Sequence, residues 1–517
     1  MRNTPPSSPR RRRTARGTLR AASLSVVLVA AAVACSDTTE GAAPEDPATT
    51  SAPTTTVAAT RPAGPAADLS TVIEGTDVFI GASTVSDLAA VGYVEEERVA
   101  TGEAAAYVAD GPLPGDGRWT LRAGDAALYR TRVLVRRPAE AADASGTVIV
   151  EWLNVSGGVD ANPEWAALEE EIVRQGHVWV GVSAQRIGVE GGPVLVPAPG
   201  AEGVAGRGLK ALRPERYGDL THPGDGHAFD IFTQVARAVR EGGDLLGGIR
   251  PTHLIAAGES QSAIALVTYH DGVQPLTDAF DAFFVHSRAS VALPLVGPGE
   301  YADLAGAIGR EPVLFRTDLD APVLVLQAEG DVDGVLTSVA ARQPDGERLR
   351  LWEVAGTAHA DRHLLGPLAD STGCGVDIND GPLHVVAKAA LRHLDTWMRG
   401  GVAPPSLERL EVTGGPTPTV RRDGDGIALG GVRTPPVDVP VEVLSGVPGP
   451  TGGVICKLLG STTPLSATRL AQRYADRGTY EEAYAAAVDA AIATGVVLDD
   501  DREAIEAFAR PDRLPGS

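Results

Sequence analysis

Short apolar segments of strand length alternate with amphipathic segments of helical length through the middle of the chain. The apolar segments are 147–153, 178–183, 253–257, 280–285, 322–327 and 349–354, and the amphipathic ones are 165–175, 230–240 and 383–399. Continuous apolar strands that alternate with helices are typical of a parallel sheet covered on both faces. The pattern therefore predicts an α/β fold with a mostly parallel central sheet.

Other segments predict what surrounds this sheet. Segments 93–108 and 128–136 alternate well enough for antiparallel strands that precede it. Two interruptions rich in Gly and Pro, 187–225 and 287–320, follow the carboxyl ends of strands. Loops of this length in a compact domain are usually functional, so we expect them to form the walls or lid of a pocket.

The carboxyl-terminal part of the chain is expected to pack on this domain. Segment 407–443 is short, punctuated by Pro and Gly, and strand-like, whereas segment 463–509 is helical and contains Tyr474, Tyr480 and Tyr484. We see no catalytic motif in this part. We therefore expect an α/β domain over 67–445 and a helical extension over 446–517.

The amino-terminal segment predicts export. Residues 1–34 contain seven Arg and no acidic residue, and residues 21–34 form an apolar run too short to span a bilayer. The run ends in Ala32-Val33-Ala34-Cys35, which is similar to the lipidation box of bacterial lipoproteins. We expect a signal peptide at 1–35 with Cys35 as the lipid attachment site; a plain A-x-A cleavage is the alternative. Residues 36–66, poor in apolar side chains, are expected to be a disordered tether.

The net charge and the absence of certain motifs limit the classes of partner and cofactor that we expect. The formal net charge of the 517 residues is −22, and such a surface repels nucleic acid and anionic lipid. We expect no nucleic-acid partner, and contact with a membrane only through the lipid anchor. The sequence has no H-E-x-x-H, C-x-x-C, P-loop or dinucleotide-binding motif, so we expect neither a metal nor a cofactor.

The chain has three cysteines. If Cys35 carries lipid, Cys374 and Cys456 remain as an even pair in an oxidising compartment. We predict a disulfide between them, which would tie the loop before helix 383–399 to the carboxyl-terminal extension. Two separately buried thiols are the alternative.

Ser260 is the candidate nucleophile. The stretch Gly258-Glu259-Ser260-Gln261-Ser262 lies between an apolar strand and an apolar helix, which is the setting of a G-x-S-x-G nucleophile elbow. A sharp turn there exposes the serine hydroxyl to a base and to a carbonyl carbon. Ser262 stands where the consensus has a second Gly. The alternative interpretation is a helix that begins after a glycine and carries a surface serine.

A base and an acid follow in the chain order expected for such a site. His359 lies on a loop of small residues after strand 349–354, where an imidazole can reach a serine above the sheet. Two acids, Glu329 and Asp331, follow strand 322–327. A carboxylate there would hold the imidazole in one tautomer. We favour Asp331, because Gly330 supplies a turn before it, and keep Glu329 as the alternative acid.

Backbone N–H groups are expected to stabilise the oxyanion of the reaction. One would belong to Gln261, the residue after the nucleophile, and the other to Val155, in the loop after strand 147–153. Gly157 and Gly158 would let that loop approach a substrate. His286, at the end of strand 280–285, would line the pocket with Arg288.

Five stretches together resemble a known family: VEWLNVSGG, GESQSA, EVAGTAHAD, NDGPLH and LLGSTTPLS. The chain resembles, over about residues 68–509, the bacterial α/β-hydrolase-domain family that is related to esterases and lipases. The resemblance implies the α/β-hydrolase fold and a triad of Ser260, Asp331 and His359.

From these residues we expect an exported serine hydrolase that cleaves small carboxylic esters without a cofactor. A serine peptidase or amidase would use the same residues. A protein of another class, a catalytically silent α/β domain that binds a ligand at the cell surface, is the remaining alternative.

Overall fold

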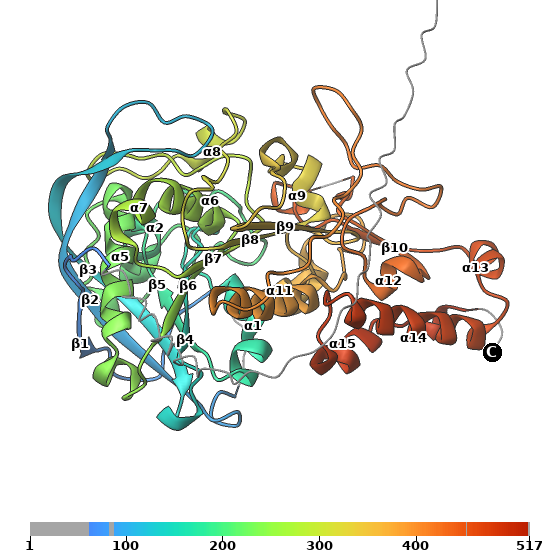
Figure 1. Ribbon diagram of the computed structural model, residues 1–517, viewed down its shortest axis with the longest axis horizontal. Helices are drawn as coiled ribbons and strands as arrows, with labels where there is room; N and C mark the ends of the chain where they lie inside the picture. The colour runs from blue at the N-terminus through green and yellow to red at the C-terminus, as the bar shows by residue number, and fades with distance from the viewer. Residues whose placement is uncertain (1–60, 82–86, 451, 515–517) are drawn as a thin grey trace, which may run out of the picture. The chain divides into compact units, whose positions relative to one another are not determined.

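A nine-stranded sheet forms the centre of the computed structural model, which describes residues 61–81, 87–450 and 452–514 (Figure 1). The described residues belong to one compact unit. In chain order the strands are β1 (Asp68–Val72), β2 (Tyr93–Ala109), β3 (Leu121–Pro138), β4 (Thr147–Trp152), β5 (Val178–Val182), β6 (His253–Glu259), β7 (Ala282–His286), β8 (Val323–Ala328) and β9 (Leu349–Val354). Their order in the sheet is β1-β2-β3-β5-β4-β6-β7-β8-β9.

The sheet has the predicted direction of pairing. Strands β5, β4, β6, β7, β8 and β9 run parallel, and β1, β2 and β3 form an antiparallel edge joined to β5. Every residue of β4, β5, β7 and β8 is buried. Strands covered on both faces need continuous apolar sequence, which explains why these four were visible in the hydrophobic pattern.

Helices cover both faces of the sheet (Figure 1). One face packs against α5 (Ala228–Glu241) and α6 (Gln261–Thr268), which share one apolar core cluster with the strands. The other face packs against α1 (Pro163–Arg174) and α11 (Leu383–Met398), which share a second cluster. The predicted α/β architecture with helices on both faces is confirmed.

The two long interruptions contain only short helices and meet each other. The first includes α2 (Arg186–Glu190), α3 (Gly208–Leu212) and α4 (Pro214–Tyr217), and the second includes α8 (Leu304–Ala307). Asp225 Oδ2 at the end of the first accepts a hydrogen bond from Ala302 N in the second, at 2.9 Å. The two segments, which follow β5 and β7 in the chain, are therefore in direct contact.

The carboxyl-terminal residues pack on the α1 and α11 side of the sheet. They comprise α12 (Pro435–Asp438), β10 (Glu442–Ser445), β11 (Ser461–Pro464), α13 (Ala467–Arg473), α14 (Arg477–Ala493) and α15 (Arg502–Glu506). Tyr474, Tyr480 and Tyr484 belong to the same core cluster as α1 and α11. Strands β10 and β11 pair antiparallel across the predicted boundary at 445/446.

Cys374 and Cys456 are bonded to each other, with their Cα atoms 5.4 Å apart. The bond joins the segment before α11 to the segment between β10 and β11. This is the connection that the even number of remaining cysteines predicts.

The predicted signal peptide, Cys35 and most of the predicted tether lie outside the described residues. Among the helices within 61–514 that the structure describes, none is long and apolar enough to cross a membrane.

Candidate active site

Ser260 occupies a sharp turn between β6 and α6. Its backbone has φ 61° and ψ −118°, in the left-handed region that a residue with a side chain rarely adopts. A Cβ atom on Gly258 would lie 2.9 Å from the Cβ of Ser262, so the turn needs a glycine at 258 and a small residue at 262. Ser262 therefore fits the elbow despite its departure from the consensus.

The structure brings Ser260, His359 and Asp331 together. His359 Nε2 lies 2.8 Å from Ser260 Oγ, and His359 Nδ1 lies 2.7 Å from Asp331 Oδ1. Asp331 is fully buried, and its other oxygen accepts a hydrogen bond from Ala328 N at 2.7 Å. Asp331 lies within a short helix, α9 (Glu329–Asp333), rather than in the expected loop. Because β6, β8 and β9 are parallel, their carboxyl ends present these three side chains on one edge of the sheet.

The alternative acid, Glu329, has other partners. Its carboxylate accepts hydrogen bonds from Gly356 N and Gly446 N, both at 2.7 Å, and pairs with Arg422 Nη2 at 2.7 Å. Glu329 therefore connects the loop between β9 and His359, through Gly356, to the residue after β10, Gly446. This geometry supports Asp331, rather than Glu329, as the partner of His359.

The pKa of His359 is set by opposing effects. Burial alone lowers it, but the carboxylates of Asp331 and Glu259 outweigh burial and raise the pKa to about 9. Only the neutral imidazole can accept a proton from Ser260. The competent form of the site thus becomes more populated as the pH rises toward 9.

Of the two predicted oxyanion donors, Gln261 directly follows the nucleophile, whereas Val155 already donates a hydrogen bond to a side chain. Gln261 begins α6, so its N–H belongs to the first turn, where backbone donors lack a partner within the helix. The N–H of Val155 donates instead to the side-chain oxygen of Gln261, at 3.2 Å. The Gln261 amide also donates to Gln185, whose oxygen accepts from Trp152 Nε1 at 3.0 Å. The N–H of Val155 is therefore engaged by the side chain of Gln261 in this structure.

Two buried carboxylates near the imidazole, those of Glu259 and Glu164, were not assigned a function from the sequence pattern. Glu259 Oε1 lies 3.5 Å from His359 Nε2, and His286 Nδ1 lies 3.5 Å from Glu164 Oε2. Burial raises the pKa of Glu259 to about 7, against the opposing charges of His359 and His286. Burial lowers the pKa of His286, but Glu164 outweighs it and the pKa lies above its ordinary value. The position of Glu259, directly before Ser260 in the chain, is the one feature of the sequence that could have indicated a carboxylate near the imidazole.

A small cavity opens at this cluster. Its wall includes Glu259, His286 and His359, together with the apolar side chains of Leu364 and Leu383. The cavity therefore reaches the imidazole from the side of α10 (Arg362–Leu365) and the start of α11. His286 lines it as expected.

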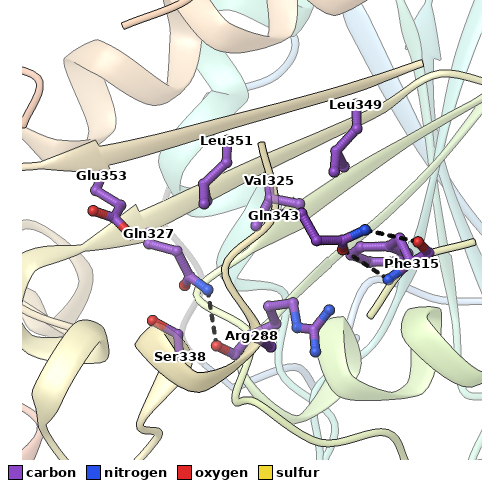
Figure 2. A pocket seen from close by; sticks show the side chains of 10 residues that line it. Arg288, Phe315, Val325, Gln327, Ser338, Gln343, Leu349, Leu351 and Glu353 are labelled. Atoms are coloured by element: carbon purple, nitrogen blue, oxygen red, sulfur yellow. Dashed lines mark hydrogen bonds between the residues drawn. The ribbon is translucent and has the colours of Figure 1, made fainter. Parts of the chain in front are cut away.

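Arg288, in contrast, lines a different cavity, which Figure 2 shows against β8 and β9. The Arg288 carbonyl accepts from Gln327 Nε2 at 3.0 Å, and its guanidinium lies 4.9 Å from the centre of the Phe315 ring. Burial lowers the pKa of Arg288 to about 10. None of Ser260, Asp331 and His359 lines this second cavity, so the expected pairing of His286 with Arg288 in one pocket is wrong.

The arrangement can move a proton from a serine hydroxyl to an imidazole held by a carboxylate. That is the first step of nucleophilic attack on an acyl group. Within the described residues, no three or more His, Cys, Asp or Glu side chains are arranged to hold a metal ion.

Comparison with known proteins places this geometry in context. A family described as "Alpha/beta hydrolase domain" matches residues 53–507. A search of curated proteins finds no match.

Solved structures that are similar include a fungal esterase from Rhizomucor miehei, with 13% identity and a TM-score of 0.31 over 61% of this chain and 92% of the other. A thermostable esterase from Pseudomonas putida has 17% identity and a TM-score of 0.31 over 61% and 84%. A serine hydrolase without a lid from Xanthomonas campestris has 16% identity and a TM-score of 0.28 over 59% and 97%.

Proposed function

Because the chain belongs to the alpha/beta hydrolase domain family, we propose that it is a serine hydrolase that cleaves carboxylic esters through Ser260, His359 and Asp331. The observation that carries the proposal is the continuous contact from Ser260 Oγ to His359 Nε2 and from His359 Nδ1 to Asp331. The strained backbone at Ser260 supports it, because such strain persists where the surrounding structure holds a residue for function.

In the first half-reaction, Ser260 Oγ attacks the carbonyl carbon of the ester while His359 Nε2 takes its proton. The carboxylate of Asp331 keeps the other ring proton on Nδ1 and stabilises the imidazolium. The bond to the alcohol then breaks, and the alkoxide leaves with the proton from Nε2. The acyl group remains on Ser260 as an ester.

The developing oxyanion would be held by the N–H groups of Gln261 and Val155. For Val155 to donate to it, the Gln261 side-chain oxygen must give up its 3.2 Å contact with that N–H. Substrate binding would therefore replace the Gln261 oxygen by the substrate oxygen as the acceptor of the Val155 N–H, while Gln185 can keep accepting from the Gln261 NH₂ group.

The cellular setting is part of the proposal and rests on the amino-terminal sequence. Seven arginines followed by an apolar run that ends at Cys35 support export. The enzyme would act outside the cytoplasm, as a lipoprotein of the cell envelope or as a secreted protein. Its substrates would be small esters that reach it there.

Hydrolysis of p-nitrophenyl acetate and butyrate by the purified protein tests the proposal. Ser260→Ala should abolish turnover, whereas Ser262→Ala keeps the Cβ that packs on Gly258 and should retain it. A p-nitroanilide with the same acyl group separates esterase from amidase activity. Loss of activity in Ser262→Ala but not in Ser260→Ala would refute the assignment, and a wild type inactive on all these substrates would refute the ester class.

A further inference from the structure

Glu259 faces the reacting nitrogen of the imidazole from a buried position. Its side chain is 7% exposed, and Oε1 lies 3.5 Å from His359 Nε2, the atom that contacts Ser260 Oγ. This separation is longer than a direct hydrogen bond between such groups. The two atoms leave no space between them at 3.5 Å, but they are close enough for one water molecule beside them to hydrogen-bond to both.

His286 supports Glu259 from the neighbouring strand. The two residues are register partners on the parallel strands β6 and β7. His286 is 5% exposed, and neither of its ring nitrogens has a hydrogen-bond partner among the described residues. The same is true of both carboxylate oxygens of Glu164, which lies 3.5 Å from His286. Buried ring nitrogens without a hydrogen bond, such as those of His286, indicate that water or a ligand completes the site beside them.

The cavity lined by Glu259, His286 and His359 supplies the space for it. The space open to the centres of water molecules is about 30 Å³, which is enough for one or two waters, since each needs at least roughly 10–15 Å³ by this measure. The cavity wall includes both groups that a bridging water would contact, the Glu259 carboxylate and the His359 imidazole.

The chemistry of the second half-reaction requires such a water. Once Ser260 is acylated, its Oγ has no proton, so Nε2 loses the donor that it contacts in the free enzyme. The neutral imidazole must then take a proton from water while the water oxygen attacks the acyl carbon. Asp331 occupies Nδ1, and therefore only the Nε2 side of the ring is available.

We propose that Glu259 is a catalytic residue for deacylation, which holds the hydrolytic water against His359 Nε2 in the cavity that it shares with His286. This inference rests on the proposed serine-hydrolase function. The water donates one hydrogen bond to the Glu259 carboxylate and gives its other proton to Nε2. Its oxygen forms a bond to the acyl carbon, the bond from that carbon to Ser260 Oγ breaks, and the proton on Nε2 passes to Oγ. Glu259 accepts a hydrogen bond only and is unchanged at the end.

The charges around Glu259 are consistent with this role. The groups that face it are His359, His286, Glu164 and Asp331; burial raises the pKa of Glu259 to about 7, and the two imidazoles oppose that rise. The carboxylate is therefore ionised at pH 8, where it accepts a hydrogen bond from water most strongly.

Stopped-flow measurement with p-nitrophenyl acetate at pH 8, followed by intact-protein mass spectrometry, tests the inference. Glu259→Gln should release the first equivalent of p-nitrophenol within about tenfold of the wild-type rate, since acylation needs no water. Its deacylation should slow by about 10²-fold, the usual contribution of a positioned group in proton transfer. An enzyme heavier by one acetyl group should then accumulate.

Glu164→Gln is the matched control, because it removes another buried carboxylate, one that pairs with His286 rather than with His359 Nε2. It should change acylation and deacylation by similar, small factors. If Glu259→Gln does not fold, Glu259→Asp withdraws the carboxylate by one methylene and should show the same selective slowing.

Equal loss of both rates in the Glu259 variants, or unchanged deacylation, would overturn the assignment of Glu259. Absence of an acetyl group on Ser260 in every variant, including the wild type under rapid quench, would instead refute the proposed serine-hydrolase function. The two failures are therefore distinguishable.

Discussion

Replacing Asp331 by Asn should greatly lower kcat, because it would place the imidazole proton on Nε2 instead of Nδ1. Asp331 has two fixed contacts: Oδ2 accepts from Ala328 N, and Oδ1 faces His359 Nδ1, each at 2.7 Å. An asparagine would keep its oxygen toward the Ala328 N–H, because that buried donor needs an acceptor. Its NH₂ group would then donate to Nδ1.

The ring proton would consequently reside on Nε2, which could not accept a proton from Ser260. A change of this kind lowers kcat by about 10³- to 10⁴-fold with little change in KM, or about 4–5.5 kcal/mol of transition-state stabilisation. Steady-state kinetics on p-nitrophenyl butyrate measures it. Combining Asp331→Asn with Ser260→Ala should add almost nothing, because the residues act as a unit.

Glu329→Gln is the matched comparison, two residues away and equally buried. Its carboxylate holds Gly356, Gly446 and Arg422, so the change should lower the free energy of unfolding by about 3 kcal/mol and kcat by only about tenfold. A large loss of kcat in Glu329→Gln together with nearly normal kcat in Asp331→Asn would show that Glu329, and not Asp331, is the acid that supports His359.

Three further predictions concern pH, the disulfide and the lipid. Neutral His359 is the base and its pKa is raised to about 9, so kcat/KM should rise with pH with an apparent pKa well above 6.5. Glu259→Gln should lower that apparent pKa, because the Glu259 carboxylate helps to raise the pKa of His359. An apparent pKa of 6.5 in both proteins would contradict this prediction. Reduction of the unfolded protein should expose two additional thiols, and an unchanged thiol count would exclude the disulfide. Cys374→Ser should lower the free energy of unfolding by about 4–5 kcal/mol, as expected for a bond that spans 82 residues. Wild-type protein from a bacterial host should partition into detergent and Cys35→Ser into the aqueous phase, whereas equal aqueous partitioning would exclude lipidation.

The sequence predicts the parallel part of the sheet because the relevant strands are buried on both faces. Strands such as β4, β5 and β8 consist of buried residues throughout, which leaves a continuous apolar run. Strand β3 was predicted from residue 128, yet it begins at Leu121. Its first half is mostly exposed and rich in small residues, so alternation of apolar and polar positions is absent there.

The positions of Ser260, Asp331 and His359 follow from chain order because each one closely follows a parallel strand. Parallel strands end at one edge, and residues after their carboxyl ends converge there. The contact between Gln261 and Val155 depends on a side-chain rotamer, and no pattern in the sequence encodes it.

The cluster of Glu164, Glu259 and His286 was not predictable as a unit for a different reason. Its members come from the start of α1, the end of β6 and the end of β7, which are far apart in the chain. Only the pairing of β6 with β7 and the packing of α1 on the sheet bring them together. Taken singly, none of these residues belongs to a sequence motif that would link it to the other two.

The proposed function depends on Ser260 as a nucleophile that His359 activates. Labelling with a fluorophosphonate, followed by mapping of the modified peptide, tests it most directly because it requires no knowledge of the natural ester. We expect one label per wild-type molecule on Ser260, none on Ser260→Ala, and labelling slowed by several orders of magnitude in His359→Ala. A label on another residue, or labelling of wild type and His359→Ala at equal rates, would contradict it.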